Sequence, residues 1–292
     1  MKNKQIKHIK FENQQNEKSQ FDIVKLEELF LKKNLDHSIE KHHKVNFFVI
    51  LFIKEGTGSH TIDFIDYSCT KGTILTIRKD QIHKFKKSEN LKGSLLIFTD
   101  DFLVNYLEKL EAHKTLLLFN EFLTEPKIQL NETEYNDINK LIYHIENEYF
   151  EEIDEFQMSI IRSALHILIT KLFRIKSKKE KIQFDKKHLT EFIKFQSLVE
   201  TNNNQTSKVK DFAYQLNLST KTLNTITRSF VNKSAKEFID EICIKQIKRL
   251  LINTTLSVKE IAYQSGFEET TNFYKYFKRQ TQSTPEQFRT EK

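Results

Sequence analysis

The stretch LSVKEIAYQSGFEETTNFYKYFKRQTQSTPEQFR, from Leu256 to Arg289, decides the fold of the second half of the chain. Ser257 and Glu260 have the spacing of a capping box, so a helix is predicted to begin there. Gly266 is predicted to end that helix, because glycine adopts a left-handed backbone at little cost. The stretch therefore begins with a short helix and a tight turn.

A second helix is predicted from about Glu269 to Gln280. Its apolar side chains recur at helical spacing and form one buried stripe, made of Phe273, Tyr276 and Phe277. Pro285 follows and ends the unit. A short helix, a turn with glycine and a second helix form a helix-turn-helix, whose second helix enters the DNA major groove.

The same unit occurs twice. VKDFAYQ at 209–215 recurs as VKEIAYQ at 258–264, with five of seven residues identical. The two helix-turn-helix units are predicted at about 208–231 and 257–280. Residues 235–253 read as one continuous helix between them, which would fix the spacing that two recognition helices need to reach successive major-groove faces about 34 Å apart.

This half of the chain resembles the AraC-type transcription regulators. The matching motifs are Ile261-Ala262, Gly266-Phe267, Asn272-Phe273, Phe277-Lys278, Thr284-Pro285 and Phe288-Arg289. The resemblance implies an all-α DNA-binding domain over residues 187–292 and a regulator of transcription that is not an enzyme. Such a regulator could also contact RNA polymerase.

Three residues depart from the pattern of the family. Gln282 stands where the family usually has glycine, and a left-handed backbone there would cost about 1 kcal/mol relative to glycine. Ala235 replaces the usual proline before the linking helix, and Cys243 replaces a usual arginine within it. The last change removes an expected ion-pairing partner.

Each recognition helix should offer polar side chains to base edges and cations to phosphates. Asn224 and Glu269 are candidates for adenine and cytosine respectively. The full set predicted to bind DNA is Thr220, Lys221, Thr222, Asn224, Thr225, Arg228, Glu269, Thr270, Thr271, Asn272, Tyr274, Lys275 and Lys278.

Length and charge fit this interpretation. The 292 residues suffice for two domains, and the formal net charge is +7. Residues 186–292 hold 18 Lys and Arg against 11 Asp and Glu, while the remaining residues hold 29 of each. All surplus positive charge therefore lies in the half with the helix-turn-helix units, where double-stranded DNA is the expected partner.

Nothing in the sequence predicts a membrane protein or an exported one. No apolar run reaches the length of a membrane span, and the polar N-terminus has no signal-peptide core. Cys69 and Cys243 are too few and too far apart for a disulfide framework, and both are expected to be buried. We expect a cytoplasmic protein.

The front half is predicted to be mostly β-structure. Residues 1–20 are predicted to be a flexible arm or an arm along a sheet edge, and short strands follow with turn residues between them, including 45–53 and 60–67. This pattern favours a small antiparallel barrel, and it resembles the cupin-like sensor domain of the same family. We therefore expect an α+β multidomain protein with a sensor barrel and following helices over 21–125.

The barrel could bind a small effector, with His43, Phe48, Phe64, His83 and Phe85 as candidate lining residues. A metal-binding cupin needs a His-x-His pair, a Glu and a later His, whereas here His42 and His43 are adjacent and only His83 could follow. No metal and no cofactor are expected. Two alternatives stay open: a cupin metalloenzyme with a DNA-binding tail, and a general DNA-compacting protein.

Residues 126–175 are predicted to form a helical hairpin with more apolar surface than one barrel needs. In the family such a hairpin usually joins two chains, so the resemblance implies a homodimer. The alternative is that the hairpin only packs on the barrel. Residues 176–186, KSKKEKIQFDK, have high charge and little periodicity, and they are predicted to be the linker between domains.

Overall fold

The computed structural model describes residues 6–13, 16, 19–32, 38–86, 88, 90–120, 122, 125–180, 188–202 and 208–291. The chain divides into two compact units, one over Lys7–Lys181 and one that includes Ile182–Lys292. The first unit is mostly β-structure with helices and the second is all helical in its described part, so the predicted α+β class is confirmed. No described helix is both long and apolar enough to span a membrane.

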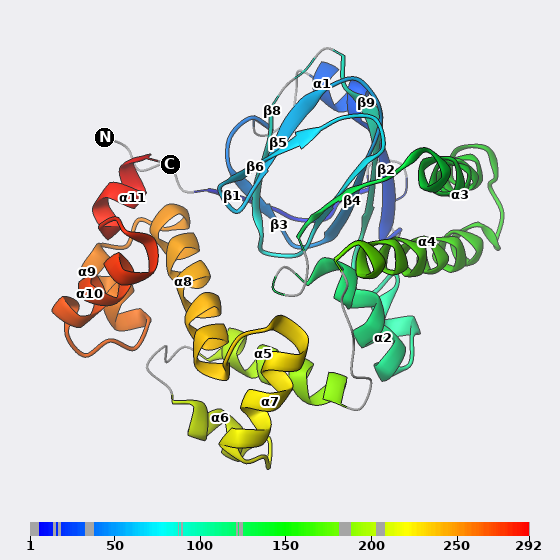
Figure 1. The fold of residues 1–292 in the computed structure, drawn as a ribbon. Coiled ribbons are helices and arrows are strands. Elements are labelled where there is room, and N and C mark those ends of the chain that lie inside the picture. Colours follow the sequence, from blue (N-terminus) through cyan, green and yellow to red (C-terminus); the bar gives the residue numbers. More distant parts are fainter. Residues whose placement is uncertain are drawn as a thin grey trace. The chain divides into compact units, whose positions relative to one another are not determined.

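Two five-stranded sheets form the barrel of the first unit (Figure 1). The first sheet has the order β1 (Lys7–Ile9), β3 (His43–Val45), β8 (Ile82–Lys86), β5 (Gly58–Ile62) and β6 (Ile65–Cys69). The second has the order β10 (Lys127–Gln129), β7 (Thr73–Ile77), β4 (Phe48–Glu55), β9 (Lys92–Phe98) and β2 (Phe21–Lys25). All described strand pairs are antiparallel except β1 with β3.

Strand β4 is apolar on both faces because both are covered. Its residues Val49, Leu51 and Ile53 belong to the core inside the barrel. The alternating residues Phe48, Ile50 and Phe52 belong to a second core, which lies between the sheet and the helices. Successive side chains of a strand point to opposite faces, so this one strand serves both cores.

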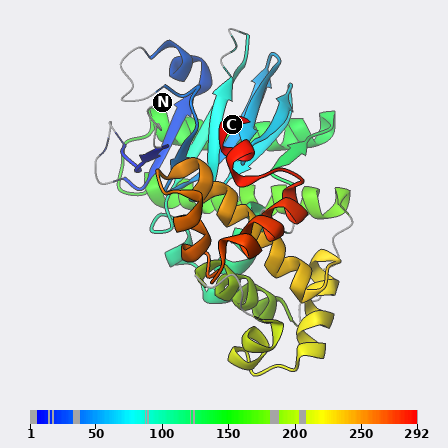
Figure 2. The same cartoon turned by 90° about the vertical axis from the view of Figure 1, so that its left-hand side faces the viewer.

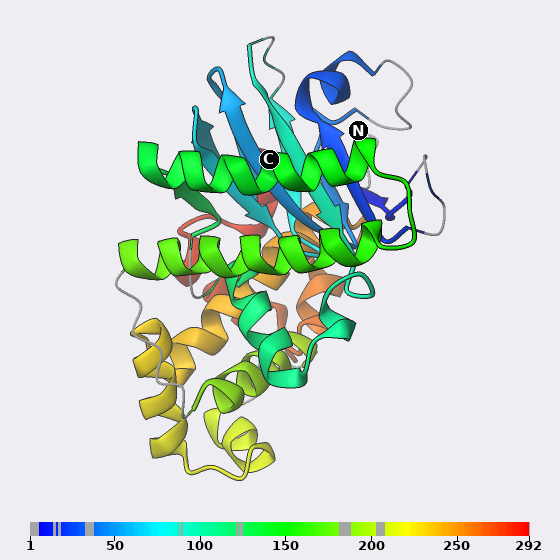
Figure 3. The same cartoon turned by 90° about the vertical axis from the view of Figure 1, so that its right-hand side faces the viewer.

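Helices α3 (Glu132–Glu151) and α4 (Gln157–Lys179) form the predicted hairpin and lie across the outer face of the second sheet (Figure 3). The capping box of Asn131 and Glu134 begins α3. Helix α4 continues to Lys179, so the first residues of the predicted linker are helical. The remaining elements of this unit are α1 (Leu26–Leu31), α2 (Lys109–Leu116) and the 3-10 helices η1 (Val104–Tyr106) and η2 (Leu117–Phe119).

Three predictions for this half are corrected or narrowed. Of the two alternatives for the N-terminal arm, flexible or edge, the described part follows the second: it contains the edge strand β1, and its Asn13 is buried, donating to the Tyr149 hydroxyl 3.0 Å away. Residues 60–67 form a hairpin of β5 and β6 instead of one strand, with Asp63 and Phe64 left-handed at the turn (φ 45° and 71°). The linker begins after α4, and residues 181–187 lie outside the described part of the chain.

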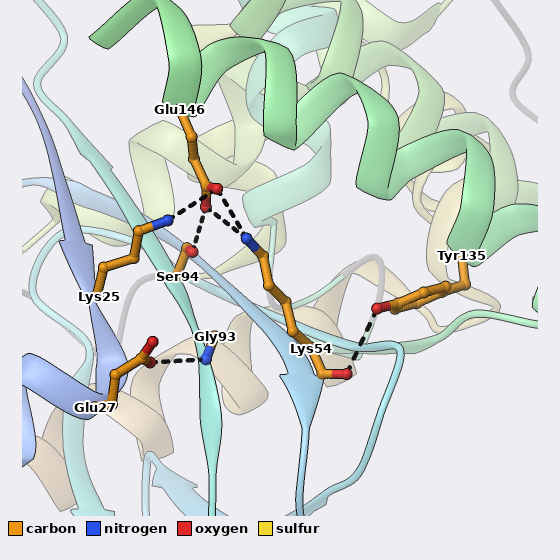
Figure 4. Close-up of polar contacts among 7 residues, drawn as sticks. All are labelled: Lys25, Glu27, Lys54, Gly93, Ser94, Tyr135 and Glu146. Carbon is orange, nitrogen blue, oxygen red and sulfur yellow. Dashed lines mark hydrogen bonds and ion pairs between the residues drawn. The ribbon is translucent and has the colours of Figure 1, made fainter. Parts of the chain in front are cut away.

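A buried carboxylate fastens α3 to the barrel (Figure 4). Glu146 is only 5% exposed, and its oxygens lie 2.8 Å from the ammonium nitrogens of both Lys25 and Lys54. The Ser94 hydroxyl also donates to it. These three partners come from β2, β4 and β9, so one helix side chain joins three neighbouring strands. The ion pairs and hydrogen bonds outweigh the effect of burial and keep the pKa of Glu146 below its usual range.

The second unit contains seven described helices: α5 (Leu189–Thr201), α6 (Val209–Gln215), α7 (Thr220–Val231), α8 (Ala235–Asn253), α9 (Val258–Gln264), α10 (Thr270–Thr281) and α11 (Pro285–Glu291). Helix α8 runs between the α6–α7 pair and the α9–α10 pair (Figures 1 and 2). Both predicted helix-turn-helix units and the linking helix are confirmed. Helix α5 has no predicted counterpart; its Phe192 stacks on Phe230 of α7 with ring centroids 4.7 Å apart.

The residues that end α7 and α10 are both left-handed. Gln282 has φ 62° and ψ 9°, and Asn232, at the equivalent position of the first unit, has φ 53° and ψ 30°. Asparagine tolerates this conformation better than glutamine does, because its short side chain bonds locally.

We therefore predict that Gln282→Gly stabilises the protein by about 1 kcal/mol, because exposed Gln282 contributes little packing and glycine removes the strain. Asn232→Gly is the matched control and should stabilise less. Denaturant unfolding of both variants measures the difference. A Gln282→Gly variant less stable than the parent would contradict this interpretation of the turn.

Candidate DNA interface

The two helix-turn-helix units close their turns with the same hydrogen bonds. In the first unit the Leu218 amide donates to the Ala213 carbonyl (2.9 Å), and in the second the Phe267 amide donates to the Ala262 carbonyl (3.0 Å). Gly266 is left-handed in the second turn (φ 79°), and Asn217 takes this conformation in the first (φ 55°). Asparagine substitutes for glycine here because its side chain tolerates a left-handed backbone.

Both recognition helices bury one side and expose the opposite one. In α7 the buried residues include Leu223 and Phe230, and in α10 they are Phe273 and Phe277. With 100° between successive residues, the opposite side of each helix is a row at spacing i, i+4, i+7. The two outward rows are Lys221, Thr225 and Arg228 on α7, and Thr271, Lys275 and Lys278 on α10, and all six residues are exposed.

The outward rows match position by position at an offset of 50 residues. The repeat therefore places an exposed cation or hydroxyl at each of three corresponding points on two helices. Burial of the opposite faces fixes the rotation of each helix, so these rows cannot turn inward without unpacking the aromatic core. Exposed polar rows of this kind are what a major-groove helix presents to bases and phosphates.

At one pair of equivalent positions, the side chains predicted to contact bases form hydrogen bonds within the protein. These residues are Asn224 and Tyr274, and each bonds to the start of the next helix. The Asn224 amide nitrogen donates to the Thr220 carbonyl (2.9 Å), and its oxygen accepts from the Ala235 backbone N–H (3.0 Å) at the start of α8. The equivalent residue of the second unit, Tyr274, donates its hydroxyl to Glu286 at the start of α11. This bond raises the pKa of Tyr274 to about 12, since the phenolate would face a carboxylate.

We predict that Asn224→Ala lowers the free energy of unfolding by about 1 kcal/mol, because the Ala235 N–H loses its acceptor. Base preference should not change, contrary to the expectation from sequence. Asn224→Asp keeps the acceptor and is the matched control. Denaturant unfolding and binding to single-base variants of one DNA site measure both effects. Relaxed preference at one base pair with unchanged stability would restore the base-reading role.

The other predicted DNA residues flank the outward rows at the helix starts. Glu269 is the exposed N-cap residue of α10, and Ser219 holds the same place on α7, where its hydroxyl caps the Thr222 amide. Thr222 also bonds the Ser219 hydroxyl through its own (2.8 Å). Asn272 is exposed, whereas Thr270 is half-buried, as Thr222 is. Thr220 stands at the first position of α7.

Helix α8 is tied to the second unit by polar contacts as well as by packing. The Tyr276 hydroxyl donates to the Asp240 carbonyl of α8 (3.1 Å). Arg289 donates to the carbonyls of Leu251 and Leu256, each 2.8 Å away. Cys243, which replaces the expected arginine, is buried in α8, and burial raises its pKa to about 12. These hydrogen bonds hold the second helix-turn-helix unit in a fixed position against α8.

Three of the five residues predicted to line an effector site lie together inside the barrel, and one residue that was not predicted lies beside them. His43 and His83 are cross-strand partners with ring centroids 4.2 Å apart, and Phe85 lies beside both. His60, which the sequence gave no reason to select, joins them, with its ring centroid 4.5 Å from Phe85 and 5.3 Å from His83.

Two predicted lining residues do not belong to this group. Phe48 lies on β4 of the second sheet, and its side chain points away from the barrel interior toward the helices. There it packs on Phe98 and Phe119. Phe64 lies in the left-handed hairpin turn, against His42. Among the described residues, no group of three His, Cys, Asp or Glu side chains is arranged to hold a metal ion.

The chain thus combines a β-barrel with a domain that contains two helix-turn-helix units. This combination is typical of DNA-binding proteins that respond to a ligand. Residues 27–152 match the AraC-like ligand binding domain, and residues 212–291 match a helix-turn-helix domain. The two matches together cover more than half of the chain. The chain belongs to the AraC family of helix-turn-helix transcription regulators, and it is not an enzyme.

Curated relatives agree with this family. The chain is 21% identical over 250 residues to the HTH-type transcriptional activator RhaS of Escherichia coli, covering 86% of this chain and 87% of RhaS. Among solved structures it is similar to fatty-acid-bound ToxT of Vibrio cholerae, with 18% identity, a TM-score of 0.42 and coverage of 92% and 94%. The C-terminal domain of the response regulator yesN of Fusobacterium nucleatum covers 34% of this chain and 98% of its own, at 26% identity and a TM-score of 0.32.

Proposed function

We propose that this regulator reads a specific DNA site with the outward rows of α7 and α10. The observation that supports the proposal is that the two rows occupy equivalent positions in the repeat. The exposed residues Lys221, Thr225 and Arg228 correspond to the exposed residues Thr271, Lys275 and Lys278. The surplus positive charge of the chain lies in the same unit, which supports a polyanionic partner.

The chemistry of the rows suggests a division of roles. Lys275, Lys278 and Arg228 lie in the middle and last turns of their helices, where cations reach phosphates or guanine edges. Thr271 and Lys221 lie in the first turns, closest to the ends that enter the groove. The exposed carboxylate of Glu269 would repel phosphate, so we place it against bases or away from the backbone.

We further propose that two chains pair through the α3–α4 hairpin. Its outward face exposes large apolar side chains at heptad spacing, Tyr143 with Phe150 on α3 and Ile160 with Ile167 on α4. Ile153 and Phe156, at the connection between the helices, are 93% and 60% exposed. Several large apolar side chains left exposed on one hairpin are what an interface between chains would cover. Sedimentation of the purified protein tests this, with a dimer expected at micromolar concentration.

The barrel is the proposed effector site, with His43, His60, His83 and Phe85 as its polar and aromatic lining. The family match to a ligand-binding domain supports this, and so does the gathering of three imidazoles in an apolar interior. We propose a cytoplasmic protein that acts on the chromosome, and contact with RNA polymerase if it activates as RhaS is described to do.

The test of function is a competition experiment. A fragment selected from random DNA by the purified protein, or from the region upstream of its own gene, is challenged with excess bulk DNA. We expect the selected site to bind at least a thousand-fold more tightly than bulk DNA. Equal affinities would instead favour general DNA compaction, the second alternative that the sequence leaves open.

A further inference from the structure

Three imidazoles share the inner face of the first sheet. His43 on β3 pairs with His83 on β8, and Phe85, two residues further along β8, pairs with His60 on β5. Paired residues, and residues two apart in a strand, point to the same face. Phe85 and Ile62 on this face belong to the core inside the barrel. The three histidines therefore point into the barrel, and each is at most 3% exposed.

His60 lacks hydrogen-bond partners. Neither of its ring nitrogens has one, although a neutral imidazole carries one N–H donor and one bare acceptor. Buried polar groups in native proteins nearly always have partners, because leaving one unsatisfied costs free energy. A fully buried imidazole aimed into a core is therefore a place where a bound molecule would supply the missing partner.

His43 has a defined tautomer. Its Nδ1 lies 2.9 Å from the Lys41 carbonyl oxygen, and a carbonyl can only accept, so Nδ1 carries the hydrogen. In the neutral ring Nε2 then carries no hydrogen. The ring is stacked on Phe85 and lies beside His83. The cluster that contains the unsatisfied His60 thus also contains a ring nitrogen that can accept a proton.

The surroundings of the histidines are apolar. The opposite sheet contributes Val49, Leu51, Ile53, Leu75, Ile77 and Leu95 to this interior. From β6 comes the thiol of Cys69, which burial keeps neutral by raising its pKa to about 11. The titratable neighbours of His60 are therefore the other two histidines, this thiol and the phenol of Tyr67, which is the cross-strand partner of His60 on β6. A single charge here would be very costly, whereas a cation hydrogen-bonded to its own anion would cost much less.

Resting on the proposed effector role of the barrel, we propose that the cluster of His43, His60 and His83 binds a small organic acid. The acid enters with its proton and transfers it to one imidazole, so that a carboxylate and an imidazolium remain and the net charge inside the barrel stays zero. A ring N–H of His60 donates to the carboxylate, and the apolar part of the acid packs on Phe85 and Ile62. In the absence of an anion, burial and the nearby His43 lower the pKa of His60 to about 3.

This mode of binding has a signature that other ligands lack. An acid that is an anion in solution must take up one proton on binding, so its affinity should fall about tenfold per pH unit between pH 6.5 and 8. A neutral sugar or alcohol would bind with no proton uptake. A divalent metal bound by neutral imidazoles would bind equally well or better as the pH rises.

The experiment is calorimetry on the intact protein with formate, acetate, isobutyrate and benzoate, in two buffers of different ionisation enthalpy. We expect at least one acid to bind with uptake of about one proton, and benzyl alcohol to bind at least tenfold more weakly than benzoate. His60→Phe should fold and lose at least tenfold in acid affinity. His60→Gln keeps a donor but cannot take the proton, and it should bind less tightly than the parent.

Three results would overturn the proposal: no binding of any of the four acids, binding without proton uptake, or tighter binding of zinc than of every acid. DNA binding by the same samples, followed by fluorescence anisotropy, separates this from the proposed function. If DNA is bound and no acid is, only the effector class is wrong. If acid is bound and DNA is not, the acid site stands and the DNA-reading role fails.

Discussion

Changing Arg228 and Lys275 together to glutamate should lower the affinity for the specific DNA site at least a hundred-fold. The two residues lie in the outward rows of α7 and α10, one in each helix-turn-helix unit, and both are exposed. Each reversal removes a cation from the interface and adds an anion facing phosphate. Loss of one good contact of this kind costs on the order of 1–3 kcal/mol, and two such losses in separate units should roughly add.

The single change Lys275→Ala separates a phosphate contact from a base contact. A lysine on phosphate contributes to all sequences alike, so affinity should fall uniformly and the dependence of log K on log salt should flatten by about one. Lys194→Glu on α5, an exposed lysine of the same unit outside both helix-turn-helix units, is the charge-matched control for Lys275→Glu and should have a much smaller effect. Equal losses for Lys194→Glu and Lys275→Glu would mean that only net charge matters.

Glu146→Ala should destabilise the barrel unit by about 3 kcal/mol. The change leaves the ammonium groups of Lys25 and Lys54 together without a counter-ion, in positions where their side chains are only 23% and 27% exposed. Breaking a buried pair by removing one partner typically costs 3–5 kcal/mol, and the partial exposure of the lysines favours the lower end. For a unit of this size the melting temperature should fall by roughly 5–10 °C.

The stabilisation by Glu146 should depend on pH in a definite direction. The pKa of Glu146 is lowered in the folded protein, so its contribution is complete above the pKa of the unfolded chain, near 4.5. The contribution is lost as the pH falls through the lower folded value. The difference between parent and Glu146→Ala should therefore be full at pH 7 and shrink below about pH 4. Glu151→Ala, at the exposed end of α3, is the control, and an equally large effect there would contradict the role of the buried cluster.

The second unit is largely predictable from sequence because its signals are local. Capping boxes, aromatic residues at helical spacing and the left-handed turn of Gly266 fix α9 and α10 to within a residue or two. The repeat then supplies α6 and α7. Hydrogen bonds between different helices could not be predicted from the sequence. Asn224 is a polar residue in a recognition helix, and no local signal shows that its side-chain oxygen accepts from the first N–H of α8.

The barrel is less predictable because both faces of its second sheet are buried. In β4 every residue from Phe48 to Ile53 is apolar, so alternation cannot distinguish the barrel interior from the helix side. For that reason the sequence pattern does not show that Phe48 faces the helices and not the barrel interior. The hairpin at Asp63 and Phe64 has no glycine to mark its turn, so residues 60–67 read as one strand and His60 was missed. Lysines after Ile175 read as linker, although lysine is a good helix former.

The most direct test of the central claim is a hydroxyl-radical and methylation-interference footprint of the protein on its selected site. Two recognition helices joined by α8 should protect two major-groove segments about one helical turn apart on one face of the DNA for each protein chain. Arg228→Glu should abolish interference in one segment and Lys275→Glu in the other. A single protected segment, or loss of both segments from either change alone with the protein still folded, would contradict recognition by two independent helices.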